Sequence, residues 1–171
     1  MRAKLIVEGK EFDIDIFNPE LQKFIKSEKK TGYERVGEGH TYSFVNAYGE
    51  IKTLDHEGSD DDLCYDEANY YSDRTVAENN ARADKLMRQL RRFAVKHREK
   101  ISPWNETKYG KRNYHYYLFY HWGTNSVETY CNDEYQTFGC IYFNSKATAE
   151  EAIKTFNDEL IWYFTEYKDS L

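Results

Sequence analysis

The feature that most constrains the fold is a local pattern that occurs twice in the same order. An aromatic pair, small polar residues, a cation and an Ala-Glu pair occupy residues 70–78 and again residues 142–150. Each stretch leads into a helical pattern. Upstream, a strand-like run reaches Gly49 in one case and Gly123 in the other, and a second strand-like run and an acidic loop follow each glycine. We therefore expect two tandem ββα-type units, at about 40–101 and 112–167. The alternative is a chance match between two common hairpin–helix motifs.

The N-terminal segment predicts a β-hairpin at residues 3–16, because apolar and acidic residues alternate along its second half and Gly9-Lys10 provides a turn. Asn18 and Pro19 are typical of a helix start, so a short helix is expected at about 19–27. The expected fold class is α+β: this hairpin and short helix, followed by the two ββα-type units, with antiparallel sheet packed on two long helices. The corresponding ranges are 1–32, 33–105 and 106–171, and we expect them to form one compact globule.

Apolar residues at spacings of three and four predict the two long helices. The first is expected at about 73–97 with Ser72 as its N-cap, and the second from about Lys146 with Ser145 or Asn144 as its cap. A capping box formed by Thr148 and Glu151 is the alternative start of the second helix.

The stretch 114–122 is aromatic on both faces of an expected strand. This favours a central strand that is covered on both sides. An exposed aromatic platform for stacking or for a protein partner is the alternative. The candidate residues for such an aromatic surface are Tyr117, Tyr120, Trp122 and Tyr130.

The net charge of -6 argues against a basic footprint over the whole molecule. The simplest role of a mildly negative net charge is to keep the protein soluble. The functional alternative is an acidic surface that imitates nucleic acid and occupies a basic cleft of a partner protein. The segments 13–15 and 55–66 are the most acidic. The candidate acidic partner-binding residues are Asp55, Glu57, Asp60, Asp61 and Asp62. A solvated acidic loop is favoured over a calcium site here, since the ligand spacing of an EF-hand is missing.

Cations gather in the second half of the first long helix. Arg88, Arg91, Arg92 and Lys96 share one helical face, whereas the corresponding part of the second helix has no such charge. The helix dipole favours cations at this end. A docking strip for phosphate or carboxylate groups is the functional alternative, and it makes these four residues candidates for binding a partner or nucleic acid.

The sequence contains no recognisable motif for catalysis or metal binding. No His or Cys pair has the spacing of a zinc site, and neither a nucleophile motif nor a glycine-rich phosphate loop occurs. We therefore expect no catalytic residues, no metal, no cofactor and no enzymatic activity. With three scattered cysteines and no long apolar run, a cytoplasmic protein without disulfides or a membrane span is expected.

Three stretches resemble a largely uncharacterised family of small proteins from phages and prophages of Gram-positive bacteria. They are Lys29–Val36, Asn69–Ala94 and Gly139–Phe164, and the likeness extends over nearly the whole chain. The shared motifs are structural, so the resemblance implies a phage or prophage origin and identifies no functional residues. Accessory phage genes often act by binding host or defence proteins.

The leading functional hypothesis is a phage-type accessory protein in the host cytoplasm that acts by stoichiometric binding and inhibits a host defence or nucleic-acid-processing protein. Nucleic-acid binding through the basic face of the first long helix is the alternative. A minor enzyme or a virion component is a third possibility without a sequence signal of its own. The sequence leaves the oligomeric state open.

Overall fold

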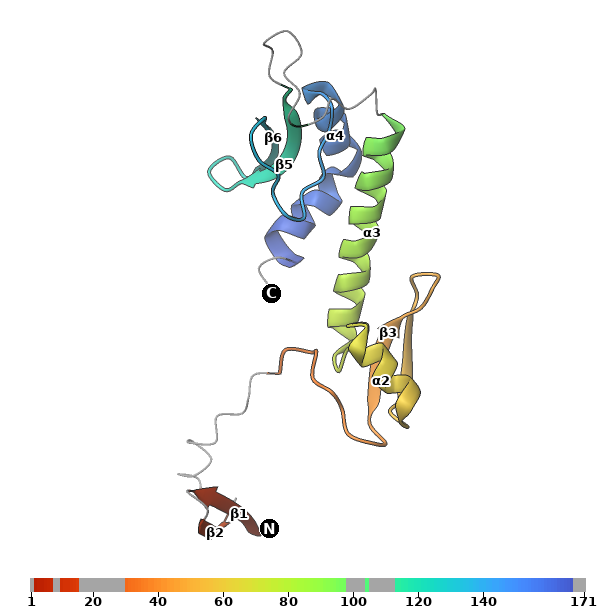
Figure 1. The fold of residues 1–171 in the computed structure, drawn as a ribbon, viewed down its shortest axis with the longest axis vertical. Helices are drawn as coiled ribbons and strands as arrows, with labels where there is room; N and C mark the ends of the chain where they lie inside the picture. The colour runs from red at the N-terminus through yellow and green to blue at the C-terminus, as the bar shows by residue number, and fades with distance from the viewer. Residues whose placement is uncertain (1, 8–9, 16–29, 98–103, 105–112, 168–171) are drawn as a thin grey trace. The chain divides into compact units, whose positions relative to one another are not determined.

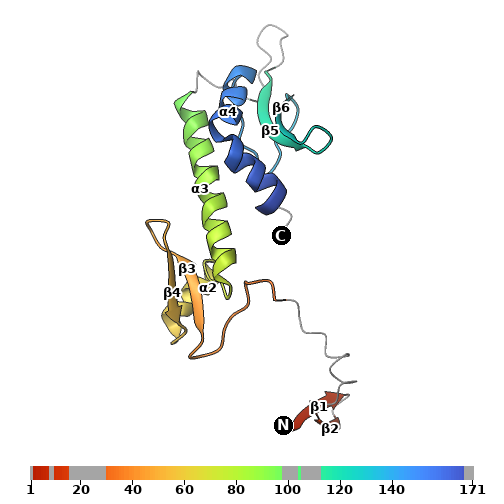
Figure 2. The ribbon, with the colours of Figure 1, turned by 180° about the vertical axis from the view of Figure 1, so that it is seen from behind.

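The computed structural model describes residues 2–7, 10–15, 30–97, 104 and 113–167 (Figures 1 and 2). They form a mixed α/β protein with two-stranded sheets and helices, in which two hairpins are followed by two helices, a third hairpin and a final helix. The predicted short helix at 19–27 and the turn at Gly9 lie outside these residues. The elements, in chain order, are β1 (Arg2–Val7), β2 (Lys10–Asp15), β3 (Thr41–Val45), β4 (Ile51–Asp55), α2 (Ser59–Asp66), α3 (Arg74–Lys96), β5 (His115–His121), β6 (Ser126–Asn132), α4 (Lys146–Trp162) and the π-helical turn η1 (Tyr163–Tyr167).

Contacts between backbones divide the chain into two units. Unit 1 comprises the described residues up to Ser43 together with Thr53–Arg74, and unit 2 comprises Phe44–Lys52 and the described residues from Thr75 onward. Almost the whole of α3 therefore groups with β5, β6 and α4. The ranges expected from the repeated pattern, 33–105 and 106–171, divide the chain elsewhere, because they follow sequence order rather than contacts.

The N-terminal hairpin predicted at 3–16 is confirmed. β1 pairs with β2 in antiparallel register, from Arg2 opposite Asp15 to Val7 opposite Lys10.

β3 and β4 form the second hairpin, and its turn contains Gly49 at φ +81, a left-handed conformation that glycine adopts without strain. The residues after β4 differ from the prediction. The acidic loop expected there is wrong, because Ser59–Asp66 is the helix α2. The carboxylate of Asp61 explains this helix: its Oδ2 accepts the backbone N–H groups of Glu57 and Gly58, which precede the first turn. A carboxylate that satisfies N–H groups at a helix start stabilises the helix.

β5 and β6 form the third hairpin, antiparallel from His115 opposite Asn132 to His121 opposite Ser126. Gly123 lies in the turn as expected, and the left-handed residue of this turn is Asn125 (φ 51). On its other side, β5 forms an antiparallel bridge between Tyr116 and Phe143. β5 thus has β6 along one edge and a single bridge on the other, but most of its residues are half-buried, so the coverage on both faces expected of a central strand is not seen.

A second bridge of the same kind occurs in unit 1. Ser43 of β3 pairs antiparallel with Tyr71, and their backbones exchange hydrogen bonds of 2.8 and 2.9 Å. Tyr71 and Phe143 are both buried, at 7% and 2% exposure, and each precedes a long helix by a few residues.

The helix α4 begins as predicted. Ser145 is its N-cap, and the Ser145 hydroxyl accepts the backbone N–H of Thr148 at 3.1 Å. The alternative start at a Thr148–Glu151 capping box is wrong. The helix has a kink at Phe156 (φ -120, ψ 20) and continues after Trp162 as the π-helical turn η1.

The core of unit 2 lies between α3, α4 and the β5–β6 hairpin, and both views show α4 beside α3 and close to the hairpin (Figures 1 and 2). The buried members of this core are Leu86, Leu90, Val127, Phe143, Ala149, Ala152 and Leu160. Among the helices of the described residues, none is long and apolar enough to cross a membrane.

Candidate binding surfaces

The five candidate acidic residues do not form one equivalent set, because two of them stabilise unit 1. Asp61 is only 8% exposed, and its Oδ1 accepts the hydroxyl of buried Tyr42 at 2.6 Å. Asp62 is half-buried and forms an ion pair with Arg35. Hydrogen bonding to Tyr42, more than to Glu57 and Gly58, holds the pKa of Asp61 below its ordinary value, so this carboxylate stays charged. Asp61 is therefore structural.

The three remaining candidates, Asp55, Glu57 and Asp60, are exposed. They line one hollow of unit 1 together with Leu54 and the start of α2. Leu54 is 50% exposed, and Leu63, one turn after Asp60 on α2, is 63% exposed. We call Asp55, Glu57 and Asp60 the acidic rim. Exposed Leu54 shares the hollow with these carboxylates, and a combination of apolar and polar surface is found in protein–protein interfaces.

An aromatic cluster lies behind this surface. The rings of Tyr42 and Tyr70 are stacked at 4.1 Å, with an angle of 8° between their planes. His56 contacts both rings edge-on, and the Tyr65 ring contacts Tyr70 edge-on. Burial raises the pKa of the Tyr42 and Tyr70 hydroxyls above their ordinary value, so both stay protonated. Tyr42 therefore links this buried cluster to Asp61, whose carboxylate accepts the backbone N–H groups at the start of α2.

The four predicted basic residues are brought together as expected. Arg88, Arg91, Arg92 and Lys96 are exposed along α3, and none forms an ion pair with another described residue. We call them the basic strip. Arg92 and Lys96 also line a hollow between α3 and α4, with Phe93, Phe156 and Glu151 among its other walls.

The four candidate aromatic residues are not brought together on one surface. Tyr117 on β5 lies opposite Tyr130 on β6, with ring centres 5.8 Å apart. Tyr120 faces the other side of the hairpin, where it packs against the core and against Phe164, and exposed Trp122 contacts Tyr120. Alternation along a strand separates these pairs. Among the four, only Trp122 (61%) and Tyr130 (56%) are largely exposed.

Within the described residues, no group of three or more His, Cys, Asp or Glu side chains is placed so that it could hold a metal ion. His115 is buried and stacked on Trp104, with ring centres 3.8 Å apart, and burial lowers the pKa of its imidazole. The cysteines Cys64, Cys131 and Cys140 form no disulfide.

Sequence reasoning missed the two exposed leucines beside the acidic rim. Neither leucine is part of a motif that predicts binding. The helix start signal was present, since acidic residues at 60–62 follow Gly58 and Ser59 and are typical of a first helical turn. That signal would have placed Leu63 and Asp60 on one helix face.

The chain matches no protein-family model, no curated protein and no solved structure.

Proposed function

We propose that this protein acts by stoichiometric binding of another protein, and that the acidic rim contacts a basic cleft of that partner. The observation that carries the proposal is the arrangement in unit 1, where Asp55, Glu57 and Asp60 are exposed around a hollow while Asp61 is used to hold α2 in place. Exposed carboxylates together with exposed leucines provide charge complementarity and apolar contact area. In line with the resemblance to phage accessory proteins, we propose a host defence or nucleic-acid-processing protein as the partner and inhibition as the outcome.

The rim can be tested by affinity capture from nuclease-treated host lysate, followed by mass spectrometry. A triple variant, Asp55→Asn, Glu57→Gln and Asp60→Asn, is expected to lose the partner, because the electrostatic attraction between rim and cleft is removed. The matched control changes three exposed carboxylates of unit 2 and has the same net charge: Asp84→Asn, Asp158→Asn and Glu166→Gln. A partner retained by the rim variant, or lost equally in the control, would rule out the rim as the contact surface.

Nucleic-acid binding is the second candidate, and the basic strip favours it. Four exposed cations on one 23-residue helix, free of ion pairs with described residues, provide regularly spaced phosphate contacts. If all four contact a single strand, raising the salt concentration from 50 to 200 mM should weaken the affinity roughly 50-fold. Fluorescence anisotropy with a labelled single-stranded oligonucleotide measures this directly. An anisotropy that does not change on addition of protein at low salt contradicts the hypothesis.

We further infer that the segments β3 to α3 and β5 to α4 are copies of one ββα-type unit, in which a hairpin is followed by a long helix. The bridges Ser43–Tyr71 and Tyr116–Phe143 support this, because in both cases the first strand pairs with the aromatic residue just before the long helix. The helix α2 interrupts the first copy alone. On this interpretation the acidic rim and the basic strip are both features acquired by the first copy.

A further inference from the structure

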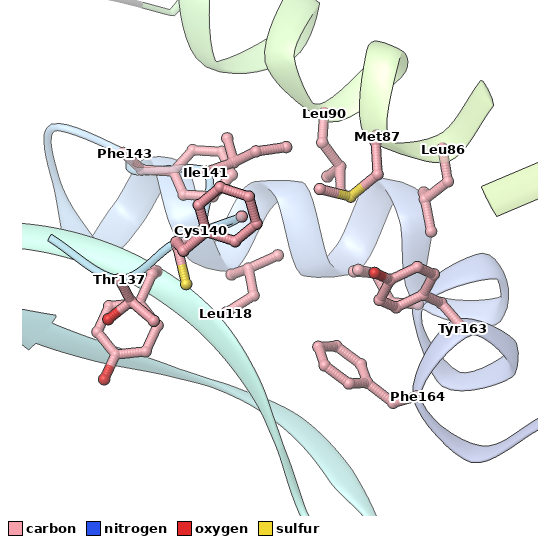
Figure 3. A pocket seen from close by; sticks show the side chains of 14 residues that line it. Leu86, Met87, Leu90, Leu118, Thr137, Cys140, Ile141, Phe143, Tyr163 and Phe164 are labelled. Atoms are coloured by element: carbon pink, nitrogen blue, oxygen red, sulfur yellow. The ribbon is translucent and has the colours of Figure 1, made fainter. Parts of the chain in front are cut away.

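An apolar pocket of about 250 Å³ lies within unit 2 (Figure 3). Three side chains of α3 form one wall, and the end of α4 with the π-helical turn forms another. Leu118 of β5 and the loop 137–143 complete it. Figure 3 shows side chains from these separate segments converging on one space, among them Leu86, Met87, Leu90, Leu118, Tyr163 and Phe164.

The π-helical turn shapes this pocket. Tyr163 and Phe164 are consecutive residues, yet both line it. A wider turn changes the direction in which successive side chains point, and π-helical turns often occur at functional sites. The hydroxyl of Tyr167 donates to Oδ1 of Asn80 at 2.6 Å, which fastens the turn to α3.

The loop at the mouth has a defined shape. The N–H of Cys140 donates to the carbonyl of Thr137 at 3.2 Å, and the N–H of Thr137 donates to the Tyr142 hydroxyl at 2.7 Å. Phe138 lines the pocket, but its side chain is fully exposed. Burial of this exposed ring against an apolar molecule bound in the pocket would be favourable.

The walls of the pocket carry no charged side chains. None of the lining residues is an acid or a strong base, and their polar groups are hydroxyls, a thiol and backbone groups. Burial raises the pKa of the Tyr163 and Tyr117 hydroxyls, so both remain neutral. Transfer of an ion into such surroundings is strongly unfavourable, whereas transfer of an apolar group is favourable.

We propose that this pocket binds an uncharged, apolar small molecule the size of one or two aromatic rings, and that Phe138 packs against the bound molecule. The volume lies below the range of drug-sized sites and above that of a dry cavity that accepts a single benzene ring. This site belongs to unit 2, so it does not depend on the acidic rim of unit 1 and adds a ligand to the protein partner proposed above.

Indole is a suitable probe, because it is uncharged, and benzoate is a matched charged control. The three cysteines provide internal reporters, since Cys140 lines the pocket while Cys64 and Cys131 do not. Alkylation of each cysteine by N-ethylmaleimide in the full chain is followed by mass spectrometry. At indole concentrations ten times its Kd, alkylation of Cys140 should slow about tenfold, with Cys64 and Cys131 unchanged. Benzoate should protect none of them.

Two variants distinguish binding of indole in the pocket from other effects of indole on the protein. Met87→Trp fills the space and should abolish protection of Cys140 by indole, with the fold verified by circular dichroism. Phe138→Ala changes only an exposed side chain, so it should fold normally and bind indole several-fold more weakly.

No protection of Cys140 in the wild-type protein would overturn the proposal. So would equal protection of all three cysteines, protection by benzoate as strong as by indole, or indole affinity unchanged in both variants.

Discussion

Arg82 and Glu159 form a two-point ion pair that links α3 to α4. The Nε of Arg82 donates to Oε2 of Glu159 at 2.8 Å, and Nη2 donates to Oε1 at 3.2 Å. The same guanidinium lies over the ring of Trp162, 3.8 Å from its centre, and Trp162 is only 7% exposed. One planar group therefore pairs with a carboxylate and covers an indole at once, a combination that lysine cannot reproduce.

Replacing Arg82 should destabilise unit 2 modestly. Arg82→Ala is expected to cost about 1 kcal/mol, since an exposed ion pair and an exposed cation–π contact each contribute at most about that much. Arg82→Lys should cost nearly as much, because it keeps the charge and loses the planar fork. Urea unfolding followed by tryptophan fluorescence measures this, since all three tryptophans belong to unit 2. Arg88→Ala, an exposed position on the same helix, is the control. A fully stable Arg82→Lys variant would show that charge alone matters.

Removing the Tyr42 hydroxyl should loosen α2. Tyr42→Phe deletes the 2.6 Å hydrogen bond to Asp61 in a buried site, which is expected to cost about 1–3 kcal/mol. Faster hydrogen exchange of the α2 amides, measured by mass spectrometry, is the readout. Tyr65→Phe is the control, because Tyr65 is 40% exposed. Equal exchange rates in both variants would contradict a structural role for Asp61.

Glu34 should make unit 1 sensitive to acid. Hydrogen bonds from Thr31, first from its backbone N–H and then from its hydroxyl, and from the Ser72 hydroxyl lower the pKa of Glu34 from 4.5 to about 2. Because the folded state prefers the carboxylate, this stabilisation is complete above pH 4.5 and is lost as the pH falls toward 2. Glu34→Gln should flatten that part of the stability–pH curve. NMR titration of Glu34 checks the premise, and a pKa near 4.5 would refute it.

The core of unit 2 should respond strongly to loss of volume on α3. Leu86 is 1% exposed, so Leu86→Ala is expected to cost about 2–5 kcal/mol in the free energy of unfolding. Val95→Ala on the same helix removes a side chain that is 60% exposed and should change stability by no more than about 0.5 kcal/mol. Chemical denaturation of both variants gives the comparison. Similar losses would mean that the buried face of α3 is assigned wrongly.

Alternation and helical periodicity predicted the N-terminal hairpin, the two long helices and the β5–β6 hairpin. Residue type limited the cap of α4 to Ser145 or Asn144, and the structure shows Ser145. Those features depend on neighbours in the sequence, so a local pattern is sufficient to find them. The helix α2 was missed, because its carboxylate-rich sequence resembles a solvated loop. Its stability depends on Asp61 and on Tyr42, which lies 19 residues earlier in the chain.

The sequence by itself determined the order of hairpins and helices and the clustering of four cations on one helix face, since spacing along a strand or helix fixes which residues share a face. Only the tertiary structure decided which charged side chains are exposed and can contact a partner. It buried Asp61 beneath Tyr42, left Asp55, Glu57 and Asp60 exposed, and separated Tyr120 from Tyr117 by the sheet itself. It also created the pocket of unit 2, whose walls come from segments distant in sequence. Burial and convergence depend on contacts between such segments, and no local pattern encodes them.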